Sequence, residues 1–134
     1  MSRTATCRCG RLSATATGEP VRVSICHCHA CQQRSGSAFS WQARWPEAQV
    51  TTRGEAKAWQ RTGDEGQVAE FSFCPVCGTT VWYVNESMPG VTAIPLGGMD
   101  GQHPPQDQPA PKVSVYENRL QPWLAVLGDD IERM

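Results

Sequence analysis

Seven cysteines stand out in this chain, and their spacing separates them into three groups. The groups are CxCG at 7–10, CxCxxC at 26–31 and CxxCG at 74–78. The first and last groups end in a glycine, Gly10 or Gly78, a residue type that adopts positive φ without strain and lets backbone N–H groups turn toward a sulfur. Structural zinc is usually bound by the cysteines of two such turns, which come from separate segments of the chain. The sequence therefore predicts a closed zinc site with four ligands: Cys7, Cys9, Cys74 and Cys77.

The middle group supplies only three cysteines, Cys26, Cys28 and Cys31, and no glycine follows it. Zinc with three protein ligands and one open position is the usual arrangement of a catalytic site, whereas structural sites are closed. Alternatives stay open at this stage. A histidine inside the motif, His29 more readily than His27, would close a second structural site, and iron can replace zinc in a thiolate site. A CxxC redox pair is disfavoured because the sequence lacks βαβ surroundings.

Three thiolate ligands would determine the reactivity of the second zinc. Such a centre carries a formal charge of about −1, so it activates water poorly compared with a three-histidine site. An added thiol is still deprotonated when it coordinates the metal, which makes it nucleophilic at neutral pH. We therefore expect the site to present a small thiol to an electrophile. Arg34 is the first candidate to bind a carboxylate of that thiol, and more cations follow: Arg44, Arg53, Lys57 and Arg61.

Length and charge limit the other classes of function. The 134 residues suit one domain. The formal net charge is −1 and no run of Lys or Arg is present, so the sequence offers no basic patch for binding nucleic acid. A disulfide framework would favour an even number of cysteines in a secretory context. The sequence also lacks an apolar run near the roughly 18 residues of a membrane span. We expect a cytoplasmic protein that binds neither nucleic acid nor a membrane.

Short strands must position these groups, because 12 Gly and 10 Pro indicate many turns and few long helices. Residues 26–37 have room for one or two helical turns before Gly36 ends them. Alternation of polar and apolar residues predicts half-buried strands elsewhere, at two places within 4–17 and then at 21–25, 38–45, 47–52, 56–61, 68–84 as a hairpin, 91–98 and 112–117. The predicted fold class is mainly β.

The chain is expected to form a single domain, 1–134, with a core of about residues 5–100, a proline-rich connector at 101–111 and a C-terminal strand and tail at 112–134. Acids in the turns and tail are interpreted as solvated surface: Asp64, Glu65, Asp129 and Asp130. Aromatic residues at strand spacing are assigned to packing and not to a ligand cage: Phe39, Trp41, Trp45, Trp59, Phe71, Phe73, Trp82 and Tyr83.

In their order and spacing, the motifs CRCG, CHCHACQQRSGSAF and FCPVCGT resemble the glutathione-dependent formaldehyde-activating enzyme (Gfa) family, which includes centromere protein V. The resemblance covers about residues 5–100, and the C-terminal tail shows a weaker similarity. It implies a mainly β, Mss4-like (β-tent) fold with two zinc ions. It also implies that the glycine-terminated turns hold the structural zinc and that Cys26, Cys28 and Cys31 hold the catalytic one, in agreement with the pairing above. The implied reaction condenses formaldehyde with glutathione to S-(hydroxymethyl)glutathione.

The tail departs from the family pattern at one position. Members often carry a His, followed by a hydrophobic pair, nine residues before a Trp. Here Ser114 stands in that place, before Val115 and Tyr116, and Trp123 is retained. If that His takes part in substrate binding or proton transfer, this chain uses another substrate or none.

Two functions from different classes follow from these observations. The first is a zinc-dependent carbon–sulfur lyase or synthase of the formaldehyde-activating type, whose partner is a small thiol or thiol adduct such as glutathione. The second is a non-catalytic binding module in which both zinc ions only hold the fold together. The coordination of the second zinc, open or closed, separates the two.

Overall fold

The computed structural model describes residues 1–99 and 107–134, and in this range the strands form two sheets. The smaller sheet has the strand order β1-β2-β5 and contains β1 (Ser2–Thr6), β2 (Ser13–Thr17) and β5 (Val50–Arg53). The larger sheet has the order β11-β10-β3-β4-β9-β8-β7-β6. Its strands are β3 (Arg22–Cys26), β4 (Ser40–Pro46), β6 (Lys57–Thr62), β7 (Val68–Phe73), β8 (Thr80–Asn85), β9 (Val91–Pro95), β10 (Val113–Val115) and β11 (Glu132–Arg133).

Most predicted strands are confirmed, and the alternation that predicted them matches their burial. In β7, for example, Ala69 and Phe71 are buried, while the residues between and beside them are more exposed. The strand at β6 was expected to be half-buried, but nearly all of its residues are exposed. The reason is its place at the free edge of the larger sheet, where it pairs only with β7. The connector predicted at 101–111 falls largely outside the described residues.

Helical structure is short, as expected. Helix α1 (His29–Ser35) begins after Cys28, whose sulfur accepts a hydrogen bond from the Cys31 N–H, and it ends at Gly36 with φ 66°. Single 3₁₀ turns form at η1 (Glu47–Gln49), η2 (Leu96–Gly98) and η4 (Glu117–Arg119). Within the described residues, no helix has the length and apolar character to cross a membrane.

The main core lies between the two sheets and surrounds Trp45. The Trp45 side chain is completely buried, and its indole N–H donates to the Gly18 carbonyl at 3.0 Å. Small and aliphatic side chains from both sheets and from their connections belong to the same core, among them Leu12, Ala14, Val81, Ile94 and Leu96. This core fixes the smaller sheet against the strands that carry the functional side chains.

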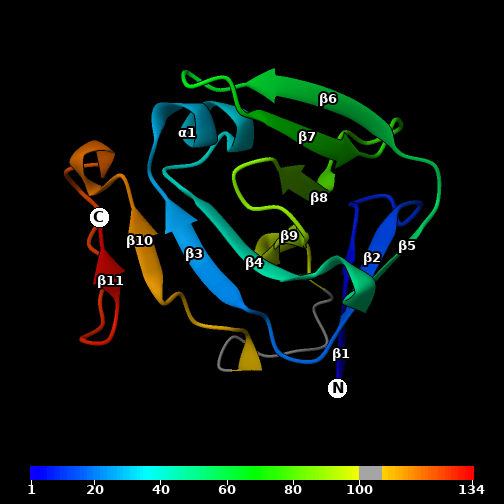
Figure 1. Ribbon diagram of the computed structural model, residues 1–134, viewed down its shortest axis with the longest axis horizontal. Helices are drawn as coiled ribbons and strands as arrows, with labels where there is room; N and C mark the ends of the chain where they lie inside the picture. Colours follow the sequence, from blue (N-terminus) through cyan, green and yellow to red (C-terminus); the bar gives the residue numbers. More distant parts are fainter. Residues whose placement is uncertain (100–106) are drawn as a thin grey trace.

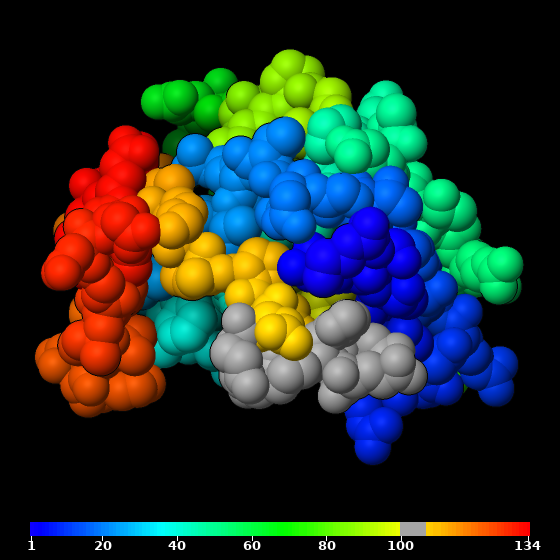
Figure 2. All heavy atoms as spheres, turned by 90° about the horizontal axis from the view of Figure 1, so that it is seen from below, coloured from blue at the N-terminus to red at the C-terminus, as the bar shows by residue number. Residues whose placement is uncertain are grey.

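The C-terminal segment completes the larger sheet with parallel strands. β10 pairs with β3, with Val115 opposite Cys26, and β11 pairs with β10. Figure 1 shows α1 directly after β3, between the β3–β4 strands and the β6–β7 hairpin. In Figure 2 the C-terminal residues form one edge of the face that is shown, beside β10. The C-terminal strand β10 and the strand β4 therefore flank the segment of Cys26.

Candidate metal centres

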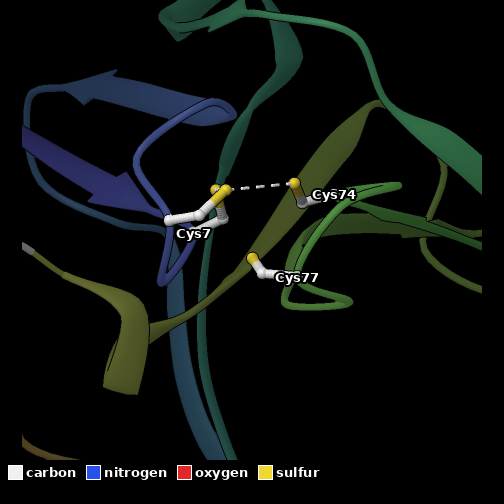
Figure 3. A group of neighbouring side chains, drawn as sticks. Cys7, Cys74 and Cys77 are labelled. Atoms are coloured by element: carbon white, nitrogen blue, oxygen red, sulfur yellow. Dashed lines mark hydrogen bonds between the residues drawn. The ribbon is translucent and has the colours of Figure 1, made fainter.

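The four cysteines of the predicted closed site come together. Their sulfurs all lie within 4.8 Å of one another, with Cys7 and Cys9 separated by 3.7 Å and Cys9 and Cys74 by 3.6 Å. A tetrahedral zinc with bonds of about 2.3 Å would separate its sulfurs by about 3.8 Å. Figure 3 shows the side chains of Cys7, Cys74 and Cys77 directed toward one common point. The arrangement of the sulfurs fits a tetrahedral metal ion.

Two similar turns build this cluster. Gly10 has φ 89° and Gly78 has φ 81°, and each donates its N–H to the carbonyl of the cysteine that opens its turn, at 3.0 and 2.9 Å. The predicted positive φ of both glycines is thereby confirmed. Backbone N–H groups point at the sulfurs, from Leu12 to Cys7 at 3.2 Å and from Val76 to Cys74 at 3.4 Å. These hydrogen bonds favour the thiolate forms that bind a metal.

The closed cluster is continuous with the hydrophobic core. Cys7 and Cys74 are buried members of the core around Trp45, whereas Cys9 and Cys77 are exposed. A hydrogen bond from Thr79, whose hydroxyl lies 3.3 Å from the sulfur, lowers the pKa of Cys77 to about 5. A metal bound here would tie the β1–β2 turn to the β7–β8 turn. Four sulfurs that adjoin the core in this way could hold a metal ion that links these two turns.

The second cluster consists of Cys26, Cys28 and Cys31, whose sulfurs also lie within 4.8 Å of one another. Cys26 ends β3, Cys28 caps α1, and Cys31 lies in its first turn, so a strand and a helix N-terminus bring the sulfurs together. All three are half-buried. A hydrogen bond with Cys26 lowers the pKa of Cys31 to about 5, and the positive charge of Arg34 acts in the same direction. These contacts favour the thiolate form of Cys31, which is the form that binds a metal.

Neither histidine of the motif joins this cluster. His27 is completely buried and points to the other side of β3, where Nε2 lies 3.0 Å from Ser114 Oγ. Burial lowers the pKa of His27, which favours the neutral ring. His29 is exposed at the start of α1. Within residues 1–99 and 107–134, the group of metal-binding side chains at this position contains three cysteines and no fourth ligand.

A cavity of about 500 Å³ opens beside the second cluster. It is bounded by β3 and β4, by α1, and by the turn between β6 and β7, and Cys26, Cys28 and Cys31 contribute to its wall. Phe71 and Tyr83 form an aromatic part of the lining, with ring centroids 4.9 Å apart. The volume is within the range of small-molecule sites. A metal bound at Cys26, Cys28 and Cys31 would therefore adjoin space for a small molecule.

Arg34, the predicted carboxylate-binding residue, lies in the cavity wall. Its guanidinium carbon is 4.7 Å from the ring centroid of Phe71 and 5.3 Å from that of Tyr83, so it rests on aromatic faces. Of the other cations considered, Arg44 and Arg61 also line the cavity, whereas Arg53 and Lys57 do not. Phe71 and Tyr83 were assigned to packing alone; both are buried, as expected, but they also face the cavity.

Arg22 and Gln42 are cavity residues that the sequence reasoning missed. A signal for Arg22 was present, because the alternation of RVSIC places Arg22, Ser24 and Cys26 on one face of β3. Asp64 and Glu65, interpreted as solvated surface, stand at the cavity rim in the β6–β7 turn.

The C-terminal segment holds α1 in place through Gln32. The Gln32 side-chain amide donates to the carbonyl oxygens of His27, at 2.7 Å, and Arg119, at 3.1 Å. The Gln121 amide in turn donates to Gln32 Oε1 at 2.7 Å. Residues nearly ninety positions away therefore orient the helix that carries Cys31.

Fold and sites together define a mainly β protein with two cysteine clusters that could each hold a metal ion. The model of the family described as "Glutathione-dependent formaldehyde-activating enzyme" matches residues 2–119. The chain belongs to this family, and its fold is the Mss4-like fold of the family.

Among solved structures, the crystal structure of a Rhodobacter sphaeroides protein is similar, with a TM-score of 0.57 and 21% sequence identity. The match covers 84% of this chain and 98% of the other chain. At this identity the likeness shows a shared fold. The comparison with curated proteins gave no significant match.

Proposed function

We propose that this chain binds two zinc ions and acts as a carbon–sulfur lyase or synthase that joins a small thiol, such as glutathione, to formaldehyde or a similar electrophile. The supporting observation is the contrast between the clusters. Four sulfurs adjoin the core, whereas three sulfurs without a fourth ligand in the described residues adjoin a cavity of about 500 Å³. Membership of the family supports the same reaction class.

The residues of the second cluster have separate roles in this proposal. Cys26, Cys28 and Cys31 would hold zinc, and zinc with three thiolate ligands would keep an added thiol deprotonated at neutral pH. The aromatic wall of Phe71 and Tyr83 limits the access of water to one side of the cavity. Arg34 places a positive charge near Cys31, which attracts an anionic thiol. A reducing, cytoplasmic setting would keep all seven cysteines available.

The test is titration of the pure, zinc-loaded protein with glutathione, followed by a rate measurement with formaldehyde. We expect calorimetric binding of glutathione and formation of S-(hydroxymethyl)glutathione faster than in buffer alone. Cys31→Ser should remove both, whereas Ser37→Ala, an exposed change just beyond α1, should leave both unaltered. Absence of binding together with a rate equal to the uncatalysed one would refute the glutathione reaction.

A second candidate function is a non-catalytic binding module, and Ser114 supports it because the family often carries a histidine there. X-ray absorption separates the two proposals. The module requires four protein ligands on both zinc ions and a large loss of stability in Cys31→Ser. The enzyme requires a second zinc whose spectrum changes when glutathione is added, and Cys31→Ser should then affect ligand exchange more than folding.

A further inference from the structure

The cavity beside the second cluster contains a buried cation that forms no ion pair with an acid among the described residues. Arg44 is 8% exposed, and its Nη1 donates to Ser24 Oγ at 3.2 Å. Residues 1–99 and 107–134 contain three ion pairs, and none of them involves an arginine of the cavity. A buried charge without a counter-ion is costly in free energy. An anion bound in the cavity would remove that cost.

A second arginine stands directly opposite Arg44. In the β3–β4 pairing, Arg22 is the register partner of Arg44, and both side chains line the cavity. Arg22 Nε is buried and lacks a hydrogen-bond partner in the described structure. Like charges that face each other across a strand pair destabilise the sheet. Two unneutralised guanidinium groups in this position form a fork that suits a carboxylate.

The same two strands connect this cationic pair to the sulfurs. Further along the same face, Gln42 lies opposite Ser24 and then Ser40 lies opposite Cys26. Arg22 and Cys26 are four residues apart, which is about 13 Å along a strand. The hydrogen bond to Ser24 shows that the Arg44 side chain extends two strand positions toward Cys26. The remaining distance along the strand to Cys26 is then about 7 Å. A bound carboxylate would thus lie roughly 7 to 13 Å from the sulfurs, and an extended peptide of two to three residues reaches the nearer part of this range, about 7 to 11 Å.

We infer that Arg44, with Arg22 opposite, is the carboxylate-binding end of the thiol site and selects peptide-like thiols whose carboxylate lies two to three residue lengths from the sulfur. This inference rests on the proposed function for the placement of the thiol, but the arginine pair is a separate feature. Arg34 differs from the pair because its guanidinium packs on Phe71 and Tyr83. Its positive charge also favours the thiolate form of Cys31 in the second cluster.

The test compares three ligands at constant ionic strength by calorimetry: glutathione, its diethyl ester and S-methylglutathione. The ester lacks free carboxylates, and the S-methyl compound cannot form a thiolate. We expect zinc-loaded protein to bind glutathione about 10- to 100-fold more tightly than the ester, as expected for the loss of a charge-assisted hydrogen-bonded pair. Arg44→Gln should remove this preference, and Arg22→Gln should reduce it. Arg53→Gln, the same change on exposed β5 outside the cavity, should leave the preference intact.

The ligand comparison uses the unaltered protein, so it decides the question even if Arg44→Gln does not fold. Equal affinity for glutathione and its ester would overturn the inference and leave the proposed function standing. Binding of S-methylglutathione that depends on Arg44, together with no exchange of thiol at the second zinc, would support the arginine pair and refute the proposed function. Binding of none of the three ligands would overturn both.

Discussion

Nε2 of His27 lies 3.0 Å from Oγ of Ser114, and both side chains are completely buried. The contact joins residues 87 positions apart and secures the junction of the parallel strands β3 and β10. It also explains why His27 is not a ligand of the second cluster, since its ring is held on the opposite side from Cys26 and Cys28. The serine at 114 is therefore part of the architecture of the site, whatever its effect on substrate choice.

Ser114→Ala should destabilise the protein by about 1 to 3 kcal/mol, because it removes the hydrogen-bond partner of a buried imidazole. The other ring nitrogen, Nδ1, already lacks a partner in the described structure. Denaturant unfolding of the metal-loaded protein measures the change, with Ser37→Ala as an exposed control. An equal, small effect of the two substitutions would show that the contact contributes little.

Removal of metal from the closed cluster should abolish the cooperative thermal transition. Structural zinc binding contributes on the order of 10 to 16 kcal/mol in small zinc domains, which matches or exceeds the whole stability of an ordinary domain. Cys74→Ser should have the same effect as chelation, since Cys74 is completely buried in the core. Calorimetric scans with and without chelator test this; an unchanged melting temperature after verified loss of both metals would contradict it.

Gly78→Ala should cost about 1 to 2 kcal/mol of stability through backbone strain alone. Gly78 has φ 81°, and a Cβ at this position would meet no atom within 4 Å, so steric overlap does not contribute. Gly97→Ala is the matched control, because that position also has open space but no positive φ. Denaturant unfolding of both variants separates strain from packing, and equal stability of the two would argue against the strained turn.

Tyr83→Phe should make the protein more resistant to alkaline unfolding. Burial raises the pKa of Tyr83 to about 12, against the opposing effect of Arg44 and Arg34. The unfolded chain loses the phenolic proton near pH 10, so the stability that this group contributes is complete below pH 10 and is lost as the pH rises from 10 through 12. At pH 11 the native protein should have lost about 1.4 kcal/mol relative to Tyr83→Phe. Parallel stability curves for the two proteins between pH 9 and 11.5 would contradict this.

Local chemistry made much of the fold and of the metal clusters predictable. The glycines after Cys9 and Cys77 indicated which turns belong together, and the alternation along the chain located the strands from β1 to β10. Strand pairing between distant segments could not be predicted, since a sequence does not show that β10 lies parallel to β3. The two residues of β11 are too few to show a period. Arg44 was named only as one of several cations, because its position opposite Arg22 depends on strand register.

The pairing of β10 with β3 also bears on biosynthesis. A chain made from its N-terminus has all four ligands of the closed cluster once Cys77 has emerged. The second cluster can reach its final arrangement only after Ser114, Arg119 and Gln121 have been synthesised, because Ser114 contacts His27 and the other two residues hydrogen-bond with Gln32. A nascent chain can therefore assemble the four-cysteine cluster before the second cluster and its cavity are complete. The chemistry proposed for the second cluster would thus require a chain whose C-terminal strand has already paired with β3.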